Sequence, residues 1–247
     1  DILPALRRSQ MYINVDNIGY TDEEIAAFAK SNPDTLNMEE ILYAATLTDD
    51  NAEKLRIYKT ASKNFPGCFR AKNAIGYVYM KEGKLNEAKQ AFGEAQAIKD
   101  NEVIKNNLGA VALAQGDLAT AESLLTSAMG AGDEVNYNLG IIKIMQGDYA
   151  SAVNYFGNKA SFNAALAQLL NGDVDKSLAT LNELGESDYA LVYYLKAVAG
   201  ARSNKEEVLI NNLRLAVEKD AGLKAHAKKD AEFIQYNANE AFIGIVE

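Results

Sequence analysis

Apolar residues recur along this chain at helical spacing, in segments that come in pairs and repeat. The stretch NNLGAVALAQGDLATAESLL begins at Asn106, and YNLGIIKIMQGDYASAVNYF begins at Tyr137 with nearly the same order of apolar and polar positions. Spacings of three, four and seven place the apolar residues on one face of a helix. Because a Gly-Asp turn interrupts each stretch, each copy predicts two short antiparallel helices.

Paired glycines mark the copies most sharply. Two glycines lie seven positions apart in three copies, and a fourth copy keeps only the second glycine: Gly76 and Gly83, Gly109 and Gly116, Gly140 and Gly147, then Gly172. The first glycine falls inside a helix, where it is unfavourable unless a neighbouring helix comes too close for a side chain. The second falls where the first helix must end, and it suits a left-handed C-cap. An aspartate follows in three copies and is expected to cap the next helix: Asp117, Asp148 and Asp173.

Small and large residues follow the second glycine at fixed distances in three copies. An alanine comes five positions later and a large apolar residue four after that: Ala88 and Phe92, Ala121 and Leu125, Ala152 and Phe156. This order resembles the tetratricopeptide repeat, a helix-turn-helix unit of about 34 residues. The resemblance implies an all-α fold, a solenoid of helix pairs wound as a right-handed superhelix. Gly147 and Gly172 lie only 25 residues apart, so we expect the helix that holds Phe156 to be trimmed, or its connecting loop to be nearly absent, near residues 157–160.

The pattern divides the chain into three parts. Residues 36–222 hold about five repeats, the last with its turn at residues 203–205, and residues 223–247 predict C-terminal capping helices. Residues 1–35 predict an extension. In it residues 9–15 alternate as a strand does, and the helix that follows is capped by Thr21 or Asp22. Because one strand cannot stand alone, we expect residues 9–15 to pair with an upstream β domain or with a second copy of the chain.

The N-terminal segment also suggests a location. Its first forty or so residues are similar to segments that join a β-rich region to tetratricopeptide repeats in bacterial cell-envelope proteins. This similarity favours a periplasmic or envelope-associated protein, with a cytoplasmic location left open.

Composition limits the chemistry. A net charge of −9 disfavours nucleic acid and anionic lipid as partners, and no apolar run reaches the ~18 residues of a membrane helix. Cys68 and His226 are the only cysteine and histidine, too few for a zinc site or a Cys–His pair. Phosphate-binding and calcium-loop motifs are missing. The sequence therefore predicts no enzyme, no cofactor and no metal.

The resemblance points to one binding surface. First helices of tetratricopeptide repeats line a concave groove that binds peptides. By the phase of the repeat, the binding residues here are Arg70, Asn73, Tyr77, Asn106, Ala110, Tyr137, Ile141, Phe162, Leu166 and Tyr194. The competing interpretation is that these side chains fill the contact between repeats.

One family subtype holds the C-terminal carboxylates of chaperones with basic residues and asparagines. Asn107 and Asn138 match its asparagines, but Asn73 and Glu134 stand where basic residues are expected, so carboxylate capture is disfavoured. The predicted function is a non-catalytic protein- or peptide-binding scaffold, in a bacterial envelope assembly. The alternatives are a structural spacer, or a glycan- or small-molecule-binding accessory to an enzyme.

Overall fold

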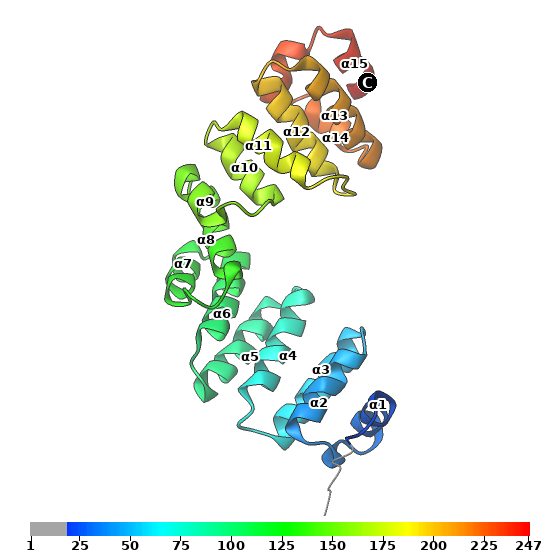
Figure 1. The fold of residues 1–247 in the computed structure, drawn as a ribbon, viewed down its shortest axis with the longest axis vertical. Helices are drawn as coiled ribbons and strands as arrows, with labels where there is room; N and C mark the ends of the chain where they lie inside the picture. The colour runs from blue at the N-terminus through cyan, green and yellow to red at the C-terminus, as the bar shows by residue number, and fades with distance from the viewer. Residues whose placement is uncertain (1–18) are drawn as a thin grey trace, which may run out of the picture. The chain divides into compact units, whose positions relative to one another are not determined.

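The structure is a computed structural model that describes residues 19–247, and these residues form helices and turns with no strand among them (Figure 1). The all-α prediction is confirmed. The strand expected at residues 9–15 lies outside the described residues. Two compact units divide the chain, the first ending at Lys99 and the second running from Asp100 to Glu247.

The first unit holds two complete helix pairs behind an N-terminal helix. Its helices are α1 Asp22–Ser31, η2 Pro33–Thr35, α2 Met38–Ala44, η3 Ala45–Leu47, α3 Asn51–Asn64, α4 Phe69–Lys81 and α5 Leu85–Ile98. Thr21 begins α1 in a capping box with Glu24, each side chain bonding the other's backbone N–H. Asn37 and Glu40 begin α2 in the same way.

The second unit continues the alternation. Its helices are α6 Glu102–Ala114, α7 Leu118–Ser127, α8 Asp133–Met145, α9 Tyr149–Phe156, α10 Phe162–Leu170, α11 Val174–Glu183, α12 Ala190–Arg202, α13 Glu206–Lys219, α14 Leu223–Ala227, η4 Ala231–Tyr236 and α15 Glu240–Val246. From α6 to α14 each helix packs on the next, and the first helices α6, α8, α10 and α12 also contact one another in that order. The C-terminal segment consists of short helices, and the middle one is a 3₁₀ helix with Asp230 at its N-cap.

The glycine predictions are confirmed. A Cβ atom at Gly76 would lie 2.6 Å from the Phe92 ring, and one at Gly109 would lie 2.7 Å from Leu125 Cγ. Real Cβ atoms essentially never lie so close to a neighbour, so glycine allows this approach without displacing the facing side chain. The second glycine of each copy has a positive φ, for example +72° at Gly83.

The predicted aspartate caps are confirmed in two copies and wrong in the third. Asp117 accepts a hydrogen bond from the Thr120 N–H, and Asp148 accepts one from the Ser151 N–H, both at 3.1 Å. Asp173 makes no such bond. Its carboxylate instead accepts from the Asn171 amide at 2.8 Å, so a neighbouring side chain takes the group that would have capped α11.

The trimmed helix is also confirmed. Helix α9 has eight residues, whereas α5 has 14, and it ends at Gly157 with φ +60°. In the last pair the turn falls where the sequence placed it. There Asn204 takes the left-handed conformation, with φ 52°, that glycine takes in the four pairs from α4–α5 to α10–α11.

Candidate functional site

The predicted binding residues lie on the first helices from α4 to α12, at positions three or four residues apart that share one side of a helix. We call this side the first-helix face. In the first unit it carries Arg70, Asn73 and Tyr77 on α4. In the second unit it carries Asn106 and Ala110 on α6, Tyr137 and Ile141 on α8, Phe162 and Leu166 on α10, and Tyr194 on α12.

In the first unit the face offers aromatic surface while its charges are already paired. Tyr77 is 56% exposed. Both terminal guanidinium nitrogens of Arg70 donate to the carboxylate of Glu39 on α2, and the bond from Nη1 is 3.0 Å long. This contact lowers the pKa of the Glu39 carboxyl. The cation that the sequence offered for binding is therefore neutralised by the protein itself.

Tyr43 on α2 belongs to the same region, and sequence reasoning missed it. Its side chain is 44% exposed, and its hydroxyl donates to Asp22 at 3.1 Å. The Asp22 carboxylate raises the pKa of Tyr43 by accepting that bond and by its charge. The tyrosine lies six residues before the turn residue Asp49, as Tyr77 lies six before Gly83. A stricter alignment of the first repeat would have found it.

Tyr137 is the centre of the face in the second unit. Its ring is 38% exposed and meets the edge of Phe156 at a centroid distance of 5.4 Å. Its hydroxyl oxygen accepts a hydrogen bond from the Asn163 amide at 2.9 Å. These contacts fix the ring between α8 and α10 while leaving part of it open to solvent.

Amide and aliphatic groups flank this ring. The Asn138 amide donates to the Asn106 side-chain oxygen at 3.2 Å, which links α8 to α6. Ala110, Ile141 and Leu166 are each partly buried. The three residues serve both interpretations, because part of each side chain packs between helices and part reaches the surface.

The contacts of Phe162 favour the interpretation that it packs between repeats. It is partly buried against the core of the last repeats, and its ring meets that of Tyr189 at 5.5 Å. Tyr189, which the sequence did not single out, is 52% exposed. The aromatic surface at this point therefore includes a residue of the loop before α12.

Tyr194 is closed off by the C-terminal segment. It is 7% exposed, and its hydroxyl donates to Asp230 at 2.7 Å. Burial first, and then the bond to Asp230, raise its pKa strongly. Asp230 comes from a segment 36 residues away in sequence, so no local pattern around Tyr194 could have revealed this partner.

The face suits recognition more than catalysis. Within residues 19–247 no group of three or more His, Cys, Asp or Glu side chains is placed to hold a metal ion. Nor is any helix there long and apolar enough to cross a membrane. What the face presents is rigid rings and amides, which combine apolar area with hydrogen bonding.

Comparison with known proteins shows a family likeness in one repeat and a likeness of fold over most of the chain. Residues 69–102 match the tetratricopeptide repeat. No curated protein matches the chain in sequence. Among solved structures, a chain of the APC/C hetero-tetramer Cut9–Hcn1 superposes with a TM-score of 0.71 at 16% identity, over 92% of this chain and 46% of that one. This chain thus spans about half the length of that relative.

Two bacterial structures are also similar. Pseudomonas aeruginosa pilF has a TM-score of 0.63 at 16% identity, with 89% of this chain and 99% of that chain covered. A tetratricopeptide repeat protein from Parabacteroides merdae has a TM-score of 0.60 at 14% identity, with 92% and 91% covered. At these identities the likeness concerns the fold.

Proposed function

The chain has the tetratricopeptide repeat fold that its glycine spacing predicted, and from that premise we propose that it is a non-catalytic scaffold that binds a protein or peptide through the first-helix face. The observation that carries the proposal is the exposure of Tyr77 and Tyr137 on this face, in two different repeats. Large rings left open to water cost stability and are favoured where they anchor a partner.

The chemistry of the first-helix face limits the class of partner that would bind there. In the second unit Ile141 and Leu166, both partly exposed, lie on the same face as Tyr137 and the linked amides of Asn106 and Asn138. An extended peptide with aliphatic or aromatic side chains fits such a strip, its backbone bonding to amides and its side chains to the apolar positions. The net charge of −9 favours a partner that is neutral or basic.

Carboxylate capture is not part of the proposal. Arg70 is held in a bidentate pair by Glu39. To bind an incoming carboxylate, it would first have to release the one it has. The structure thus supports the argument from sequence against a chaperone-type clamp.

An envelope setting is the finer part of the proposal. It rests on the N-terminal resemblance to envelope proteins and accords with the bacterial origin of two similar structures. Fractionation of cells of the source organism that express a tagged full-length protein would test it. Recovery in the cytoplasmic fraction alone would contradict it.

Binding can be tested with a matched set of variants. We expect Tyr77→Ala with Tyr137→Ala to melt near the wild-type temperature, because both rings are substantially exposed, yet to lose a partner captured from lysate of the source organism. Lys89→Ala on α5, exposed and away from the first-helix face, serves as the control. A partner retained equally by all three proteins would contradict the assignment of the face.

Phe162 separates the two interpretations of the predicted residues. Phe162→Ala should cost ~3 kcal/mol if the ring is packing filler, as its contact with the core suggests, and much less if it serves binding. Adding it to the double variant, to give the Tyr77, Tyr137 and Phe162 triple variant, should therefore lower the melting temperature markedly. A thermal melt settles this without knowledge of the partner.

A further inference from the structure

The charge of the first unit is divided along the chain. Residues 19–53, which include α1 and α2, hold nine acidic residues and one basic residue, a net charge of −8. Residues 54–99, which include most of α3 and all of α4 and α5, hold ten basic and three acidic residues, a net charge of +7. The overall charge of −9 therefore hides one strongly basic segment. Unlike the chain as a whole, this segment attracts acidic groups.

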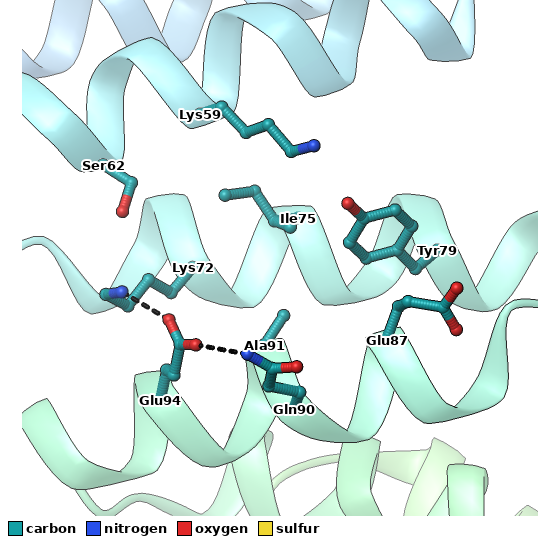
Figure 2. Close-up of a pocket in the computed structure, with 9 residues that line it drawn as sticks. All are labelled: Lys59, Ser62, Lys72, Ile75, Tyr79, Glu87, Gln90, Ala91 and Glu94. Carbon is teal, nitrogen blue, oxygen red and sulfur yellow. Dashed lines mark hydrogen bonds and ion pairs between the residues drawn. The ribbon is translucent and has the colours of Figure 1, made fainter.

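The basic segment contains a cavity of about 300 Å³ among α3, α4 and α5 (Figure 2). Ile75 and Ala91 supply its apolar lining. The cavity also reaches Tyr79 on α4, and residues two apart on a helix point to nearly opposite sides, so it lies away from Tyr77. It is therefore separate from the first-helix face and would serve a second partner.

Two hydrogen-bond donors at one end of the cavity are uncommitted. Neither the Lys59 ammonium nor the Tyr79 hydroxyl makes a hydrogen bond or an ion pair with any residue that the structure describes. Lys59 Nζ lies 5.5 Å from the centre of the Tyr79 ring, and Figure 2 shows the hydroxyl of that ring pointing to the side from which Lys59 extends. A carboxylate placed here would accept from both groups.

A second cation lies at the same ring. Lys84 Nζ is 5.9 Å from the centre of the Tyr79 ring and 2.8 Å from the Glu82 carboxylate. Because Lys59 and Lys84 each lie within 6 Å of the ring centre, their ammonium groups are less than 12 Å apart. The bond to Glu82 first, and then the charge of Glu87, raise the pKa of Lys84. This end of the cavity therefore carries two ammonium groups, and the Lys59 ammonium has no ion-pair partner among the described residues.

The wall formed by α5 is acidic but largely balanced. Lys72 Nζ lies 2.6 Å from Glu94 Oε2, and Gln90 donates to the other carboxylate oxygen at 3.1 Å, as the dashed lines in Figure 2 show. These bonds lower the pKa of Glu94. Glu87 makes no ion pair within 4.0 Å in the part of the chain that the structure describes. It is the one lining carboxylate that would repel an acidic ligand, and its removal is a sensitive test.

We propose that this cavity binds an acidic segment of a partner protein, with one carboxylate at Lys59 and the Tyr79 hydroxyl and a neighbouring aliphatic side chain against Ile75. The basic segment attracts the partner, and the two donors give the carboxylate charge-assisted hydrogen bonds. A long polyanion such as nucleic acid would also meet α1 and α2, which pack against the basic helices and whose segment has a charge of −8. A short acidic segment avoids that repulsion and uses the apolar lining.

Three blocked peptides separate charge from apolar contact. Acetyl-EELEE-amide carries both features, acetyl-QQLQQ-amide lacks the charges, and acetyl-EESEE-amide lacks the aliphatic side chain. The readout is the NMR shift of the Ile75 δ-methyl group in the full chain, assigned with Ile75→Val. We expect the first peptide to bind about tenfold more tightly than either of the others, the value of one charged hydrogen bond or one partly buried leucine. Equal binding of all three, or no Ile75 shift with any of them, would overturn the proposal.

Variants of the chain assign the contacts. Lys59→Gln should weaken acetyl-EELEE-amide about tenfold, and Glu87→Gln should strengthen it, because a repelling carboxylate is removed. The matched control is Lys89→Gln, which makes the same change of charge at an exposed residue of α5 that does not line the cavity. Equal weakening by the two lysine variants would overturn the proposal, since net charge alone would then explain binding.

A polyanion is the last outcome to separate. Oligothymidylate of twelve nucleotides should shift the Ile75 methyl less than acetyl-EELEE-amide at equal concentration. Tighter binding of the oligonucleotide would overturn the proposal in favour of a nucleic-acid site. None of these results depends on the first-helix face, so they stand or fall separately from the partner proposed for that face.

Discussion

Within the helix pairs α4–α5 and α12–α13, the two helices of each pair pack closely, but they do so in two different ways. In α4–α5 the missing Cβ of Gly76 makes room for a side chain, the ring of Phe92. In α12–α13 the missing Cβ of Gly200 makes room for backbone, since it would lie 2.6 Å from the Leu209 nitrogen. Both pairs therefore bring their two helices close together, but the atoms that make the closest contact differ between the pairs.

Aligned positions show how the placement of small and large residues differs between the two pairs. Counted from the turn residue, Leu209 stands where Ala88 stands in α5, and Ala197 stands where Gly76 stands in α4. Leu209, Ala88 and Ala197 are all fully buried. In the last pair the small residue has moved one turn along the first helix, to Gly200, and the closest contact has moved toward the connecting turn. A large residue can then occupy the alanine position.

Adding one methyl group at each glycine gives the largest expected contrast. We expect Gly200→Ala to lower the free energy of unfolding by about 3 kcal/mol, because the backbone of α13 cannot rotate out of the way. Gly76→Ala should cost about 1 kcal/mol, since a ring can shift and alanine favours the helix. Urea denaturation of the full chain measures both values.

Second-site changes sharpen that contrast. Phe92→Leu should relieve part of the Gly76→Ala penalty, because it removes the ring that the new methyl group meets. Leu209→Ala should give Gly200→Ala no such relief, because the clash there is with backbone atoms. Relief in both pairs would mean that side chains set the approach in each.

Enlarging the alanine position should have the next largest effect. We expect Ala88→Leu and Ala121→Leu each to cost about 2 kcal/mol, because both residues are fully buried at a close helix contact and no glycine stands at the position equivalent to Gly200 to make room. Denaturation midpoints of the two variants check this. Midpoints like the wild type's would show that these pairs could adopt the α12–α13 arrangement without strain.

Cap removal tests a smaller difference between pairs. Asp117→Ala should cost about 1 kcal/mol, since it deletes the bond to the Thr120 N–H. Asp173→Ala should cost a few tenths of a kcal/mol, roughly a neutral surface change, because no cap bond is lost. Thermal melts of the two variants compare them. A larger loss from Asp173→Ala would contradict the difference that the structure draws.

The smallest effect is one of pH. Bonds from the Ser151 hydroxyl and backbone N–H hold the pKa of Asp148 below its usual value. The folded chain then binds this proton less readily than the unfolded chain, so the contribution is complete above about pH 4 and is lost as pH falls through the folded pKa. The stability advantage of the wild type over Asp148→Asn should shrink over that range and stay constant above it. An advantage that grew on acidification would contradict this assignment.

The sequence predicted those features of the fold whose cause lies within a few residues, and it missed those whose cause lies far along the chain. Gly83 and Gly116 predicted their turns because the constraint is local, a positive φ that glycine adopts readily. Gly200 was not recognised, because it lies outside the seven-residue spacing and its reason, the backbone of α13, appears only in three dimensions.

The binding face shows the same limit. The phase of the repeat placed Tyr77 and Tyr137 on their helices, and the structure shows both rings exposed. The phase of the repeat could not show that Glu39 pairs with Arg70 or that Asp230 binds the Tyr194 hydroxyl, because those partners lie 31 and 36 residues away in sequence.

The eight-residue α9 has a consequence for how the second unit opens. A helix of this length completes few of its own i to i−4 hydrogen bonds and relies on its neighbours α8 and α10 for stability. We expect its amide protons to exchange with deuterium before those of the 13-residue α8 and α12. Among helices α6 to α13, Tyr149–Phe156 is then the expected point of first opening, where local unfolding would separate the repeats before it from the larger core that follows.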